Sequence, residues 1–91
     1  MLFMVTHTHS PDLCPVDNPV ALAQLANPDH AAQAGVKVLS SYNAPPEHTL
    51  YIALEAADYA AVVVFLRPLM KIGTPRISPV LPLGESLNVL H

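Results

Sequence analysis

The sequence is poor in charge, and above all in positive charge. Only 12% of its 91 residues are charged, Lys and Arg together number 4, and the net charge is −3 with histidine neutral. A nucleic-acid-binding surface needs clustered basic side chains to displace the counterions of the phosphate backbone. An anionic membrane surface likewise attracts clusters of Lys and Arg. The charge balance therefore argues against both partners, nucleic acid and membrane.

Cysteine, glycine and long apolar runs are also scarce. The single cysteine, Cys14, excludes an internal disulfide and is compatible with a reducing, cytoplasmic location. Three glycines leave no glycine-rich phosphate loop. The longest apolar run, Ala60 to Leu66, ends at Arg67 and is far shorter than the roughly 18 residues that a membrane span requires. The apolar start, Met1 to Val5, lacks the basic leader of a signal peptide. We therefore expect a cytoplasmic protein.

Apolar residues, in contrast, are abundant for so small a chain. They make up 52% of the sequence, whereas a domain of this length buries only about 60–65% of the surface that its unfolded chain exposes. The surplus apolar surface predicts that the protein works as a homo-oligomer, a dimer or a larger assembly.

The pattern along the chain predicts four strands and two helical segments. The first helical segment starts at Asn18-Pro19, restarts at Asn27-Pro28 and stops at Gly35, because Asn caps a helix, Pro suits its first position and Gly suits its end. The second starts at Asp58 and reaches about Arg67 or Met70, where Pro68 kinks or ends it. The predicted strands, from their β-branched and aromatic content, are Leu2–His9, Val36–Tyr42, Thr49–Glu55 and Arg76–Leu83.

The order β-α-β-β-α-β predicts an α+β, ferredoxin-like domain over residues 1–83, followed by a C-terminal tail over residues 84–91. The expected four-stranded antiparallel sheet has the order 4-1-3-2. Pro79 and Pro82 agree with this order, since proline in a sheet is tolerated at an edge strand. The second helix is apolar on all sides between Ala60 and Leu66, which predicts either that a second subunit covers it or that the second face of the sheet packs on a partner.

Three stretches carry a resemblance to a known family: MLFMV (Met1–Val5), EAADYAAVVVFL (Glu55–Leu66) and RISPV (Arg76–Val80). With them the chain resembles the small uncharacterised bacterial proteins of the dimeric α+β barrel superfamily. The resemblance implies two ferredoxin-like units with facing sheets, and a ligand or active site between sheet and helices. That superfamily includes cofactor-free monooxygenases, isomerases, haem-degrading enzymes and metal-binding proteins, so the fold does not select the function. The chain departs from the uncharacterised group by lacking Trp and by carrying THTHSPDLCP (Thr6–Pro15).

That distinctive stretch contains the strongest candidate for chemistry. His7 and His9 are two residues apart on a predicted strand, which places both imidazoles on one face about 7 Å apart. Cys14 follows in a proline-rich loop. Strand three should run antiparallel beside strand one, which brings His48 to the same edge. Imidazole and thiolate suit Zn²⁺, Ni²⁺ or copper. The sequence therefore predicts a transition-metal site formed by His7, His9, Cys14 and His48.

An ordinary structural role is the competing interpretation of these residues. Strand histidines often face solvent, and a lone cysteine is commonly a small buried hydrophobe. The spacing matches no established zinc finger or ribbon.

A second candidate function uses the few cations. Tyr42, Arg67, Lys71 and Arg76 are predicted to approach the same edge, where they could bind a small, anionic organic ligand. His7 or His9 would then act as a general base, with Arg76 or Lys71 as anion partner. The alternative to metal binding is thus an enzyme or binder of the dimeric barrel type. An interaction module without chemistry is the third interpretation. The ordinary interpretation of the cations is that they solvate loop ends or meet the C-terminal end of the second helix.

Overall fold

The computed structural model describes residues 1–14 and 20–90. Its centre is a four-stranded antiparallel sheet in the order β2-β3-β1-β4. This is the order predicted from the sequence, and it is consistent with a ferredoxin-like fold. The strands are β1 (Leu2–His9), β2 (Val36–Ala44), β3 (Thr49–Ala56) and β4 (Gly73–Val80).

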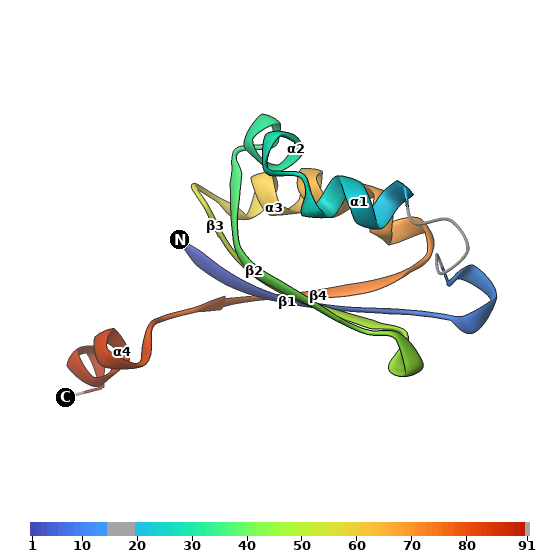
Figure 1. The fold of residues 1–91 in the computed structure, drawn as a ribbon. Coiled ribbons are helices and arrows are strands. Elements are labelled where there is room, and N and C mark those ends of the chain that lie inside the picture. The colour runs from blue at the N-terminus through green and yellow to red at the C-terminus, as the bar shows by residue number, and fades with distance from the viewer. Residues whose placement is uncertain (15–19, 91) are drawn as a thin grey trace.

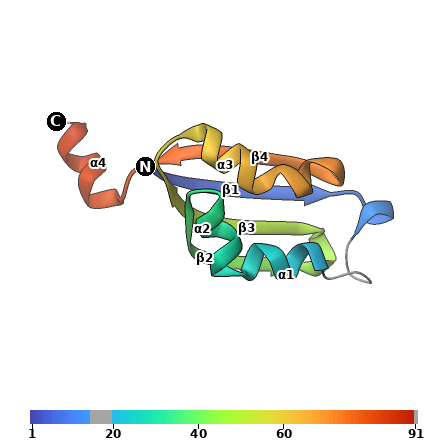
Figure 2. The ribbon, with the colours of Figure 1, turned by 90° about the horizontal axis from the view of Figure 1, so that it is seen from above.

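Three helices cover one face of the sheet, and the other face carries none of the described helices (Figure 1). They are α1 (Val20–Ala26), α2 (Pro28–Gln33) and α3 (Tyr59–Leu66). Short 3₁₀ turns, η1 (Pro11–Leu13), η3 (Pro45–Glu47) and η4 (Arg67–Lys71), join the elements. A last helix, α4 (Leu83–Val89), extends away from the sheet beyond the end of β4 (Figure 2). None of the helices within the described ranges is long and apolar enough to cross a membrane.

The capping residues act as the sequence predicts. The Asn27 side chain accepts a hydrogen bond from the backbone N–H of Asp29 at 2.9 Å, which restarts the helix as α2. Gly35 ends this segment with a φ of +78°, a conformation that costs glycine little. Asp58 caps α3 by accepting from the N–H of Ala61 at 2.9 Å. The predicted start at Asn18-Pro19 lies outside the described residues.

The fourth strand begins earlier than predicted. Pairing with β1 sets its limits, from Gly73 opposite His9 to Val80 opposite Leu2. The predicted range Arg76–Leu83 was therefore displaced, and Pro82 follows the strand rather than lying in it. The edge position is confirmed, since β1 is the one described strand that pairs with β4.

Alternation along β1 separates a buried face from an open one. Phe3, Val5, His7 and His9 are buried toward the helices, whereas Met4 between them is 42% exposed on the opposite face. The helices complete the core from the other side. The buried apolar residues are Phe3, Val5, Leu25, Ala31, Val36, Leu50, Ile52, Leu54, Ala56, Val62, Phe65, Leu66 and Leu69.

The apolar helix α3 is buried on one side within the chain. Val62, Phe65 and Leu66 pack into the core, while Val64 is 61% exposed. Cover of this second side by another subunit stays a prediction.

Candidate metal centre

The site lies where β1 ends and β3 begins. These strands are antiparallel neighbours, as predicted, and Thr8 is opposite Thr49 in their register. Beyond that pair, the backbone N–H of His9 donates to the carbonyl of His48 at 3.0 Å. Two residues far apart in sequence are therefore fixed side by side by the backbone, before any side-chain contact is made.

On the other side of β1, a glycine allows unusually close strand packing. A Cβ added at Gly73 would lie 2.2 Å from the carbonyl oxygen of Thr8 and 2.7 Å from the Cα of His9. Both are backbone atoms, which cannot swing aside. The absence of a Cβ at Gly73 thus allows β4 to pack closely against the end of β1, and this packing fixes the backbone of His9.

His48 has a rare backbone conformation. It follows the 3₁₀ turn Pro45–Glu47 with φ 53° and ψ 39°, and its N–H donates to the carbonyl of Pro45 at 3.1 Å. Left-handed backbone is uncommon for residues with a side chain and costs about 1 kcal/mol or more. A histidine at a position suited to glycine points to a role for the imidazole itself.

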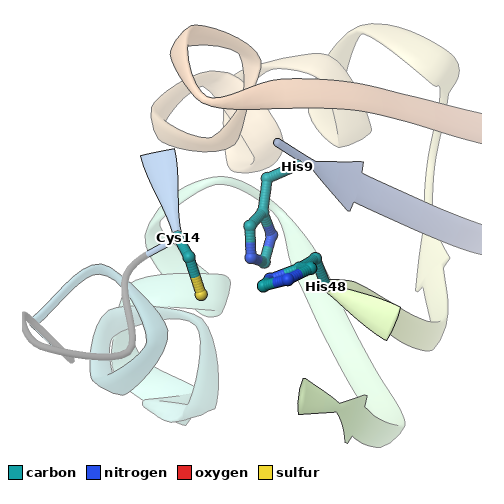
Figure 3. Close-up of side chains that lie close together, drawn as sticks. All are labelled: His9, Cys14 and His48. Carbon is teal, nitrogen blue, oxygen red and sulfur yellow. The ribbon is translucent and has the colours of Figure 1, made fainter. Parts of the chain in front are cut away.

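Cys14 approaches from the other side of the site. The turn η1 ends at this residue, whose N–H donates to the carbonyl of Pro11 at 3.3 Å. The free thiol is half-buried. Figure 3 shows the side chains of His9, Cys14 and His48 converging from β1, from the end of η1 and from the turn before β3.

The three side chains are close enough to share one metal ion. One ligand atom from each of His9, Cys14 and His48 can be chosen so that all three lie within 4.8 Å of one another. Around a tetrahedral Zn²⁺, with bonds of about 2.0–2.3 Å, such atoms are about 3.3–3.7 Å apart. A contraction of at most about 1.1–1.5 Å therefore suffices, within reach of side-chain rotation at the half-buried Cys14 and His48.

Unpartnered imidazole nitrogens mark the same place. His9 is 6% exposed, and neither its Nδ1 nor its Nε2 has a hydrogen-bond partner among the described residues. The buried Nδ1 of His48 also has none there. Leaving a buried polar atom unpaired costs about 1–3 kcal/mol. A bound ion with His9 and His48 as ligands would satisfy such nitrogens.

The electrostatics keep His9 in the form that binds metal. Burial lowers the pKa of His9 below 6.5, and the nearby imidazoles of His7 and His48 lower it further. The ring is therefore neutral at pH 7, with a lone pair free to coordinate.

His7 lies beside this group but is engaged elsewhere. Its ring centroid is 5.7 Å from that of His9, and it is fully buried. Its Nε2 lies 2.9 Å from the carbonyl oxygen of Leu69 in η4, a group that can only accept. The hydrogen bond to Leu69 could not be predicted from residue types, because its acceptor is a main-chain carbonyl. Pro68, which follows α3, does indicate the turn η4 in which this carbonyl lies.

The predicted cationic pocket is divided between two faces. Tyr42 is opposite Tyr51 and Arg76 is opposite Thr6, on the open face away from the imidazoles. A β-bulge between Val38 and Ser40 inserts one residue into β2 and so reverses which side chains face the helices in the rest of the strand. Tyr42 therefore lies on the open face. Arg67 and Lys71 are exposed in η4, whose backbone contacts His7.

Comparison with known proteins gives a family. A search of curated proteins finds no match to the chain. The model of the family described as a domain of unknown function, DUF3303, matches residues 1–91. The chain, a small α+β fold on an antiparallel sheet with two imidazoles and a thiol at one end, therefore belongs to the DUF3303 family.

Proposed function

We propose that the protein binds one transition-metal ion through His9, Cys14 and His48. The observation that carries the proposal is His9, a buried imidazole with both nitrogens unpartnered among the described residues, beside a thiol and a second imidazole. Its neutral state at pH 7 and the left-handed backbone of His48 support it. We propose a role as metal sensor, carrier or storage module.

The donor set selects the class of metal. Two imidazoles and one thiolate favour Zn²⁺, Ni²⁺ or copper over Mg²⁺ and Ca²⁺, which prefer oxygen. Among residues 1–14 and 20–90 these three are the candidate ligands, and a four-coordinate ion held by them would have a fourth position for water or an exchangeable ligand. An exchangeable fourth ligand would suit metal transfer or sensing better than permanent structural binding.

Titration with Co²⁺ tests the proposal, because thiolate-bound Co²⁺ gives a charge-transfer band in the near ultraviolet. We expect one Co²⁺ per chain, displaced by Zn²⁺. Cys14→Ser should abolish the band, and His9→Ala should weaken binding at least tenfold. His30→Gln, which changes a histidine on α2 that contacts Phe65 instead, is the matched control and should bind as the wild type does. Binding that is absent, or unaffected by the changes at His9 and Cys14, contradicts the proposal.

A second candidate function rests on the open face of the sheet. Thr6, Thr8, Thr74 and Arg76 line one hollow there. A guanidinium among hydroxyl groups suits a carboxylate or phosphate. We propose binding of a small anionic organic ligand as this alternative. Retention of ligand by the wild type but not by Arg76→Gln, measured by calorimetry, would favour it.

We further propose a homodimer of the dimeric α+β barrel type, with the open sheet faces packed together. The exposure of Met4 (42%), Tyr42 (67%) and Tyr51 (38%) on that face supports it. Light scattering after size-exclusion chromatography should show a dimer, and Met4→Glu should convert it to a monomer. Because Met4 lies on the face of β1 opposite His9, this variant should still bind Co²⁺. A wild-type monomer at micromolar concentration contradicts the dimer.

A further inference from the structure

The hydrogen-bond partner of His7 shows which of its ring nitrogens carries a hydrogen. Because the Leu69 carbonyl can only accept, the Nε2 of His7 carries the hydrogen and donates it at 2.9 Å. A neutral His7 then has a lone pair on Nδ1. This atom is buried and has no hydrogen-bond partner in residues 1–14 and 20–90. His7 therefore presents an unused acceptor inside the protein.

His9 presents the complementary group. If one of its nitrogens binds the ion, the other carries the hydrogen, since a neutral imidazole has one N–H. That N–H is buried and needs an acceptor. Metal-bound histidines generally donate this hydrogen to a protein group, which fixes the tautomer and the ring orientation.

We propose that Nδ1 of His7 accepts this hydrogen bond from the non-ligating N–H of His9, so that His7 is the positioning residue of the metal centre. The inference rests on the proposed function. The centroids of the two rings are 5.7 Å apart with an interplanar angle of 32°. Rings joined by a linear N–H···N bond have centroids about 5 Å apart, so the observed separation exceeds that of a hydrogen-bonded pair by less than about 1 Å, and rotation of the rings would then align the two nitrogens.

The resulting chain of groups runs from the core to the ion. The Leu69 carbonyl holds His7, His7 holds His9, and His9 binds the metal. His7 and Leu69 are both fully buried, so packing fixes the end of this series of groups that lies in the core. His48 is also near His9, with ring centroids 5.3 Å apart, but in the proposal it is itself a ligand.

Two substitutions separate this role from simple packing. His7→Asn places an amide oxygen near the position of Nδ1 and removes the donor to Leu69. His7→Gln places an amide near the position of Nε2 and removes the acceptor for His9. We expect His7→Asn to bind Co²⁺ within a few-fold of the wild type and His7→Gln to bind about 10- to 100-fold more weakly. A structural role would reverse this order, and equal affinities in the two variants would also overturn the inference.

A measurement on the wild type covers the case in which a variant fails to fold. Ring ¹H–¹⁵N correlation spectra of the Zn²⁺-loaded protein should show His7 protonated at Nε2, and a His9 ring N–H that exchanges slowly with water. Protonation of His7 at Nδ1 would overturn the inference while leaving metal binding intact. Failure of the wild type to bind Co²⁺ or Zn²⁺ would instead overturn the proposed function, and this inference with it.

Discussion

Replacing His48 by Gly and by Ala separates the two consequences of its backbone conformation. Both variants delete the imidazole, with the Nδ1 that has no partner in the part of the chain that the structure describes, and its edge contact with His9. They differ only in the Cβ, at a position where φ is 53°. The comparison therefore isolates the cost of left-handed backbone from the loss of the ligand.

The expected difference in unfolding free energy is about 1 kcal/mol in favour of glycine. Left-handed backbone costs a residue with a Cβ about 1–2 kcal/mol. Glycine loses about 0.4–1 kcal/mol of this advantage, because its unfolded chain is more flexible. For a domain of this size, 1 kcal/mol corresponds to about 4–8 °C in Tm. His48→Gly should thus unfold at a measurably higher temperature than His48→Ala.

Calorimetry of the metal-free variants, at one protein concentration, measures this difference. An Ala variant as stable as the Gly variant would refute the argument that residue 48 is strained. Repeating the scans with Zn²⁺ tests the ligand role separately. The wild type should gain about 2.7 kcal/mol when free metal is 100-fold above Kd, whereas both variants should gain little. An equal gain in the variants would remove His48 from the site.

Three further changes should have defined effects. The pKa of His9 is lower in the folded state than in the unfolded chain. Its contribution to the free energy of unfolding should therefore be fully present above pH 6.5 and be lost as pH falls through the folded-state pKa. Urea titrations across this range should show a weaker decline for His9→Gln. Gly73→Ala forces a Cβ onto backbone atoms of β1 and should cost about 1–3 kcal/mol in urea unfolding and weaken Co²⁺ binding; Gly84→Ala, which meets nothing within 4 Å, should do neither. Asp58→Ala removes the cap of α3 and should cost about 1 kcal/mol by the same assay, whereas Asp58→Asn should retain most of it.

The close approach of the candidate ligands was predictable because it depends on topology. Antiparallel pairing of β1 with β3 brings the end of one to the start of the other, and spacing by two residues puts His7 and His9 on one face. Composition and element order also sufficed for the α+β class and the strand order.

The placement of Tyr42 and Arg76 depends on details that the pattern does not contain. The bulge between Val38 and Ser40 reverses the alternation in β2, and the register with β1 decides which face Arg76 takes. The left-handed backbone of His48 and the hydrogen bond from His7 to the Leu69 carbonyl could not be predicted either. Residue types alone specify neither a backbone dihedral nor which main-chain acceptor a side chain will meet.

The position of β1 between two neighbours protects the imidazoles against register error. If the strand slipped by one residue, Thr8 would turn inward among the helices, and His7 and His9 would turn outward. Such a slip must break the ladders with β3 and β4 at once, whereas an edge strand need break only one. Insertions or deletions within Leu2–His9 should therefore be far less tolerated than those in the turns that follow.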